Sequence, residues 1–132
     1  MILAIRTDKP EAELHLLKDG KVIDSYIWQA HRELADTILS KINDFLTKNE
    51  TNLNHLKGLI VFTGKGSFTG LRIGTTVANG LSYGLSVPIV AAEGDSWIEQ
   101  GLDGLKNTKP NNFVIPKYSG EPNITKPKSS SA

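Results

Sequence analysis

Apolar and polar positions along residues 1–30 follow patterns typical of β-strands. Residues 2–5 (ILAI) form a short apolar run, which predicts a buried strand. Residues 11–17 and 21–28 alternate between apolar and polar positions, and the Asp19-Gly20 pair between them is a strong signal for a two-residue hairpin. The apolar side chains that we expect on one side of the third strand are Val22, Tyr26 and Trp28. These segments predict three strands joined as a meander.

The period of the pattern changes after residue 30. Apolar residues recur every three or four positions over residues 31–48, which predicts an amphipathic helix. Residues 58–62 (GLIVF) are continuously apolar, as in a parallel strand that is buried on both faces. A second helix is predicted over residues 69–85, a short buried strand over 88–92 and a brief helix over 96–102. The apolar stripe expected on the first helix consists of Leu34, Ala35, Ile38, Leu39, Ile42, Phe45 and Leu46.

The order β-β-β-α-β-α-β predicts an α/β fold, with a mixed sheet of about five strands and helices packed on it. From residue 106 onward the composition shifts toward Pro, Asn, Lys and Ser, so we expect an extended or disordered tail over residues 106–132. A small apolar island at residues 113–115 is interpreted as an added edge strand. The predicted folded unit is therefore residues 1–105.

Composition narrows the classes of function. The length of 132 residues suits one domain, and the formal net charge of +1 gives no global basic field that would favour nucleic acid. The absence of cysteine excludes disulfides, thiolate catalysis and cysteine-ligated zinc. The apolar run at the start ends at Arg6 and is too short for a signal peptide or a membrane span. We therefore expect a soluble, cytoplasmic protein that does not associate with a membrane.

The glycine-rich segment VFTGKGSFTGLRIG, residues 61–74, lies between a predicted buried strand and a helix, where backbone N–H groups often bind anions. It fails the P-loop pattern because Gly66 follows Lys65, and it fails the dinucleotide pattern because Thr69 replaces the third glycine. We therefore interpret the segment as a tight turn and helix start, with phosphate contact as the alternative. The residues assigned to this role are Gly64, Gly66, Ser67 and Thr69.

Small residues recur along the second predicted helix. Gly70, Gly74 and Ala78 are spaced by four and form a narrow ridge, and Gly80 and Gly84 add a second row. Glycine costs about 1 kcal/mol relative to alanine inside a helix, so the ridge predicts close approach of another element. That element is either part of the same fold or part of a partner chain, and the sequence leaves both alternatives open.

Two groups of polar residues are candidate chemical sites. A histidine near a carboxylate, as in His31 and Glu33, can bind metal or move a proton, but a polar helix start is the simpler interpretation. Asp8 is the only acid near the predicted end of the first strand, where Arg6 takes the place that a nucleotide-binding sheet gives to an acid. We therefore predict a turn there, and we assign no catalytic residue and no metal site.

Three segments resemble the TsaB (YeaZ) family: ILAIRT, residues 2–7; HREL, residues 31–34; and GKGSFTGLRIG, residues 64–74. The family reads G-P-G-S-F-T-G-[LV]-R-[IV]-G, from which only Lys65 departs. The resemblance covers about residues 1–92. It implies an actin-like ATPase (ribonuclease H-like) subdomain. It also implies a non-catalytic partner in tRNA threonylcarbamoyladenosine synthesis, working with a TsaD-like catalytic subunit and a TsaE-like ATPase.

The chain departs from the family at three points. Arg6-Thr7-Asp8 stands where the family has Asp-Thr-Ser, Lys65 replaces a proline, and too little chain follows residue 105 to form the second subdomain. Pro116-Lys117-Tyr118 resembles a segment near the usual end of the family. We therefore expect a shortened form that has lost its second half and kept the tail.

The resemblance implies that the two main helices form the partner interface. A leucine at Gly74 is then expected to abolish partner binding while the domain stays folded. No cofactor is expected, with ATP at the partner interface as the alternative, and tRNA is contacted only through the complex. The residues assigned to the interface are His31, Leu34, Ile38, Ile42, Gly70, Arg72, Gly74 and Ala78.

Two other functions stay open at this point. One is a small nucleotide-binding or ATP-hydrolysing domain that uses the loop at residues 64–70, with Asp8 as its acid. The other is a homodimer that pairs through the same two helices.

Overall fold

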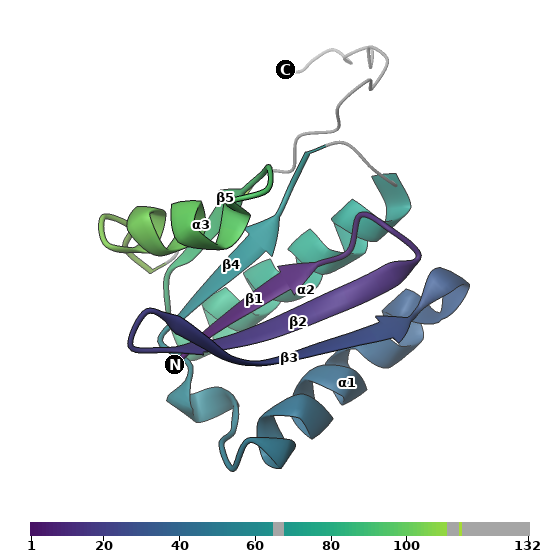
Figure 1. Ribbon diagram of the computed structural model, residues 1–132, viewed down its shortest axis with the longest axis horizontal. Coiled ribbons are helices and arrows are strands. Elements are labelled where there is room, and N and C mark those ends of the chain that lie inside the picture. Colours follow the sequence, from purple (N-terminus) through teal and green to yellow (C-terminus); the bar gives the residue numbers. More distant parts are fainter. Residues whose placement is uncertain (65–67, 111–113, 115–132) are drawn as a thin grey trace.

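A computed structural model describes residues 1–64, 68–110 and 114 of the chain (Figure 1). The predicted order of strands and main helices is confirmed, and so is the third helix. The elements are β1 (Ile2–Arg6), β2 (Glu11–Lys18), β3 (Lys21–Gln29), the 3-10 turn η1 (His31–Glu33), α1 (Leu34–Lys48), the 3-10 turn η2 (Leu53–His55), β4 (Gly58–Phe62), α2 (Phe68–Leu85), β5 (Ile89–Ala92) and α3 (Trp97–Leu105). The predicted edge strand at residues 113–115 lies outside the described residues except for Val114.

The strands form one five-stranded mixed sheet in the order β3-β2-β1-β4-β5. The two hairpin contacts, β1–β2 and β2–β3, are antiparallel, whereas β4 pairs in parallel with both β1 and β5. Asp19 and Gly20 have φ values of 53° and 79°, so both residues of the predicted hairpin turn are left-handed, as a type I′ turn requires. The predicted mixed α/β sheet is therefore confirmed.

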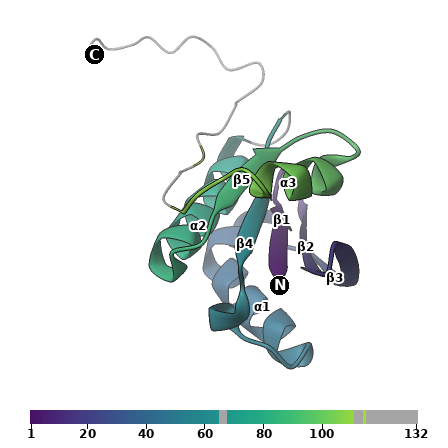
Figure 2. The same cartoon turned by 90° about the vertical axis from the view of Figure 1, so that its left-hand side faces the viewer.

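Helices cover both faces of the sheet (Figures 1 and 2). α1 and α2 pack on one face, over a core that includes Leu3 and Ile5 of β1, and α3 packs on the other face against Ile60 and Phe62 of β4. Because β4 has neighbours on both faces, all of its residues are buried, as its continuous apolar sequence predicted. No helix in the described ranges is both long and apolar enough to cross a membrane.

A bulge corrects one expectation about β3. Leu16 of β2 pairs with Asp24 and Leu17 pairs with Val22, so Ile23 is an extra residue in the ladder. The extra residue reverses the alternation, because side chains change face at each position. Tyr26 and Trp28 therefore pack on the α1 side as predicted. Val22 instead shares the opposite face with Leu17 and is 46% exposed.

The first predicted helix begins later than its apolar pattern indicated. His31 has a φ of 46°, and the N–H groups of Ala30 and His31 both donate to the carbonyl of Pro10, at 3.0 and 3.1 Å. This tie to the turn after β1 shapes the chain into the 3-10 turn η1 before α1 starts at Leu34. The apolar stripe of α1 is also narrower than predicted, because Ala35 and Leu39 are exposed.

The small residues of α2 face the sheet. Gly74 is buried, and a Cβ built on it would collide with Oγ1 of Thr7, which follows β1. The same Oγ1 donates a hydrogen bond to the carbonyl of Gly70, at 2.7 Å, and Ala78 is fully buried. The ridge therefore serves packing within the fold, one of the two alternatives that the sequence left open. The expectation that leucine at Gly74 would leave the domain folded is corrected for the same reason.

Replacement of Gly74 by alanine is expected to destabilise the protein. The added methyl forces Thr7 aside, and overpacking of this kind costs roughly 1–3 kcal/mol. Urea unfolding of the variant measures the effect. Gly84→Ala is the control, because its new Cβ meets nothing within 4 Å, and it should raise the free energy of unfolding by up to about 1 kcal/mol. If the destabilising effects of Gly74→Ala and Thr7→Ala simply add in the double variant, Thr7 does not obstruct the added methyl group.

A polar cluster lies on the α3 side of β2. Glu13 pairs with His15 (Oε1 to Nε2, 3.0 Å) and with Lys9 (Oε2 to Nζ, 3.1 Å). Nδ1 of His15 is 2.7 Å from Oγ of Ser25, and its ring meets that of Trp97 edge-on. Burial by itself raises the pKa of Glu13, but the hydrogen bonds and charges of His15 and Lys9 outweigh it and hold the pKa below its ordinary value.

The lowered pKa makes the contribution of Glu13 to stability depend on pH. The ionised carboxylate favours the folded state above its ordinary pKa of 4.5, and this contribution is lost as the pH falls through the lowered folded value. Glu13→Gln should therefore be less stable than the parent near neutral pH, and the difference should shrink at a pH well below 4.5. Urea unfolding at both pH values measures this. The role given to ionised Glu13 is wrong if the stability difference stays constant between the two pH values, or if Glu99→Gln shows the same pH dependence.

Candidate functional site

The acid that follows β1 is held in an ion pair. Nε and Nη2 of Arg6 contact the two carboxylate oxygens of Asp8 at 2.8 and 3.2 Å. The guanidinium lies 3.9 Å from the centre of the Phe62 ring, and the hydrogen bond to Asp8 raises the pKa of Arg6. Asp8 is only 8% exposed, so this ion pair occupies its carboxylate. The predicted turn accommodates this pair, and the acid required by the nucleotide-binding alternative is already engaged.

The glycine-rich loop is described only at its two ends. Gly64 has a φ of 131°, a conformation that side chains rarely adopt, so glycine is required for the turn that leaves β4. Thr69 is exposed in the first turn of α2. Gly66 and Ser67, which share the proposed turn and phosphate role, lie outside the described residues, as does Lys65.

The residues assigned to a partner interface fall into two groups. His31 and Arg72 are exposed. The others are buried against the chain's own sheet, because the apolar stripe of α1 and the small ridge of α2 form the interior of this domain. Their assignment to a surface that touches a partner is therefore corrected. The buried residues are Leu34, Ile38, Ile42, Gly70, Gly74 and Ala78.

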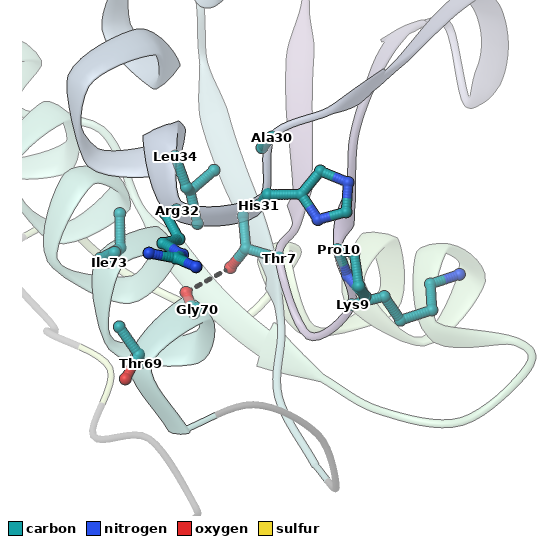
Figure 3. A pocket seen from close by; sticks show the side chains of 10 residues that line it. All are labelled: Thr7, Lys9, Pro10, Ala30, His31, Arg32, Leu34, Thr69, Gly70 and Ile73. Carbon is teal, nitrogen blue, oxygen red and sulfur yellow. Dashed lines mark hydrogen bonds between the residues drawn. The ribbon is translucent and has the colours of Figure 1, made fainter.

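Two adjoining pockets form a groove along the start of α2. The first, of about 430 Å³, lies between η1, the turn after β1 and the first turns of α2 (Figure 3). The second, of about 400 Å³, continues between α1 and α2 and shares Thr69 and Ile73 with the first. We call the pair the α1–α2 groove. Its lining residues are Thr7, Lys9, Pro10, Ala30, His31, Arg32, Leu34, Ala35, Thr69, Gly70, Arg72, Ile73, Thr76 and Val77.

Beside the groove, α2 presents an exposed row that points away from the sheet. We call Arg72, Thr76, Gly80 and Tyr83 the outer row of α2, because their spacing of three and four residues places them on one side of the helix. Tyr83 is 68% exposed, and a Cβ at Gly80 would meet nothing within 4 Å. Of this row, the predicted interface included only Arg72, and the sequence analysis did not single out Thr76 and Tyr83. The sequence signal that could have found them is the second row of glycines.

Comparison with known families finds relatives that are named for a tRNA modification. A family model described as TsaD, tRNA N6-adenosine threonylcarbamoyltransferase, matches residues 27–94. The tRNA threonylcarbamoyladenosine biosynthesis protein TsaB of Escherichia coli K12 is 35% identical over 100 residues, which cover 76% of this chain and 43% of the relative. TsaB of Bacillus subtilis 168 is 32% identical over 90 residues, covering 68% of this chain and 39% of the relative.

Solved structures agree with these sequence relatives. YeaZ from Pseudomonas aeruginosa superposes with a TM-score of 0.64 at 28% identity, over 70% of this chain and 43% of that protein. RuvC of T. thermophilus, solved with a Holliday junction, superposes with a TM-score of 0.51 at 9% identity, over 87% of this chain and 82% of that chain, a likeness of fold alone. The chain spans less than half the length of the curated relatives named above. It belongs to the TsaB (YeaZ) family and has the actin-like, ribonuclease H-like fold of that family.

Proposed function

We propose that this chain is a non-catalytic scaffold subunit in the synthesis of tRNA threonylcarbamoyladenosine, and that it docks a TsaD-like catalytic partner through α1 and α2. In this proposal it works in the cytoplasm, without a resident cofactor, and a TsaE-like ATPase joins the assembly. tRNA is reached only through the complex. The relatives named TsaB support the pathway, but they are more than twice as long as the matched region, so the partners are part of the proposal.

The observation that carries the proposal is a pair of exposed glycines on α2, Gly80 in the outer row and Gly84 one turn later. Gly80 and Gly84 lie on the exposed side of a regular helix, where glycine lowers helix stability by about 1 kcal/mol relative to alanine. Unlike Gly74, neither has a neighbour that needs the space within the described part of the chain. Close approach of a second protein to the backbone of α2 gives them a use. Exposed Tyr83 beside them, and exposed Leu39 on α1, provide apolar contact area for such a partner.

The pairing of Asp8 with Arg6 supports a role without chemistry. A nucleotide-hydrolysing site of this fold class needs a free carboxylate to position metal or water, and both carboxylate oxygens of Asp8 contact Arg6. Calorimetry with ATP and magnesium tests this part of the proposal. Micromolar binding by the isolated chain would instead favour the small nucleotide-binding domain.

Gly80→Leu is expected to block docking without harming the fold. A Cβ at this position meets none of the described atoms within 4 Å, and leucine favours helix more than glycine does, so the isolated variant should be at least as stable as the parent. Its affinity for the TsaD-like subunit should fall at least about tenfold, roughly 1.4 kcal/mol, because the side chain holds the two backbones apart. Titration calorimetry with the purified subunit measures the loss.

The matched control places the same side chain on the opposite face. Glu99→Leu lies on the exposed side of α3 and should bind like the parent. Full affinity of Gly80→Leu would show that the outer row of α2 is not the docking face. Light scattering without the subunit distinguishes the homodimer: if the chain dimerises and Gly80→Leu makes it monomeric, the same face pairs two copies.

A further inference from the structure

We propose that the α1–α2 groove receives an acidic segment of the docking partner, one that carries carboxylate side chains next to aliphatic ones. This inference rests on the proposed docking function and specifies the chemistry of the partner. It follows from the charge of the groove, from the lack of ion-pair partners for its two arginines among the described residues, and from the apolar side chains that line it.

The charged side chains that line the groove are all of one sign. Lys9 and Arg32, together with His31, line the first pocket, and Arg72 lines the second. Among the residues that the structure describes, neither lining includes an aspartate or a glutamate. The chain as a whole is almost neutral, with a formal charge of +1, so this is a local concentration of cations rather than a consequence of composition.

Two of these cations have no counter-charge of their own. Lys9 is paired with Glu13 at 3.1 Å, and Glu11 lies near both Lys9 and His31. Within the ranges that the structure describes, by contrast, Arg32 and Arg72 form no ion pair and no side-chain hydrogen bond. Figure 3 shows the Arg32 side chain reaching across the first pocket toward Ile73 and Gly70, whereas Lys9 extends away from it. The two arginines are therefore available to an external carboxylate, for which the guanidinium is a good match.

The floor of the groove favours a protein segment over an RNA backbone. The groove is also lined by the aliphatic groups of Leu34, Ala35, Ile73 and Val77. A phosphodiester chain offers charge but no apolar side chains to cover such a surface. A peptide segment with both carboxylates and aliphatic side chains matches the cations and the floor together, and complementary charges of this kind speed and orient docking.

Charge reversal tests the inference. Arg32→Glu and Arg72→Glu, singly and together in the full chain, are titrated with the purified TsaD-like subunit at about 50 mM and about 500 mM salt. At low salt the double variant should bind at least about tenfold more weakly than the parent, and its affinity should depend less on salt. Lys21→Glu is the control for the change of net charge in each single variant, because Lys21 is exposed at the far hairpin, and it should bind like the parent. Circular dichroism and urea unfolding verify that each variant is folded.

The outcomes separate this inference from the docking proposal. If Gly80→Leu blocks docking and the double arginine variant binds like the parent, the acidic partner is wrong and the docking face stands. If Gly80→Leu and the double arginine variant both bind like the parent, the docking face and the acidic partner are both wrong. If the double variant instead loses direct binding of tRNA and keeps the subunit, the groove binds nucleic acid. Restored binding to the double variant, by a subunit with a groove-facing carboxylate changed to lysine, would establish the pairing.

Discussion

The close contact between α2 and the end of β1 determines how the rest of the surface is arranged. Gly74 lets the helix backbone approach Thr7, and the hydroxyl of Thr7 binds the carbonyl of Gly70 one turn earlier. With this side of α2 fixed against the sheet, the helix has no freedom to rotate. Arg72, Thr76 and Gly80 must then face outward. The outer row of α2 and the position of Arg72 on the groove are consequences of that single contact.

Local patterns predicted the elements well, because the elements depend on local sequence. Alternation identified the strands of the meander, and the Asp19-Gly20 pair identified its turn. The orientation of the glycine ridge was a different matter. Spacing by four shows only that small residues share a face, and the partner of that face, Thr7, is more than sixty residues away in sequence. Whether the ridge packs inside the fold or against another protein therefore depends on a residue that is far away in the sequence, and the spacing does not identify that residue.

The same limit applied at β3 and at the start of α1. The bulge at Ile23 depends on how β2 and β3 pair, and no periodicity within β3 reports it. The turn at His31 depends on a hydrogen bond to Pro10, which belongs to a different segment. The sequence did not predict the candidate groove for a related reason, because Lys9, Arg32 and Arg72 come from three separate segments of the chain. The ion pair of Arg6 and Asp8 is local, and its sequence did predict a turn there.

The bulge in β3 also bears on the risk that this edge of the sheet pairs with other chains. β3 is an edge strand, and edge strands offer unpaired backbone groups to any other extended chain. Exposed Ile23 and Ile27 would make a flat β3 an attractive template for stacking. The extra residue twists the strand and interrupts the regular register that such stacking requires, and Lys21 adds a charge near the break. One inserted isoleucine therefore helps to keep the free edge of the sheet at β3 from recruiting further chains.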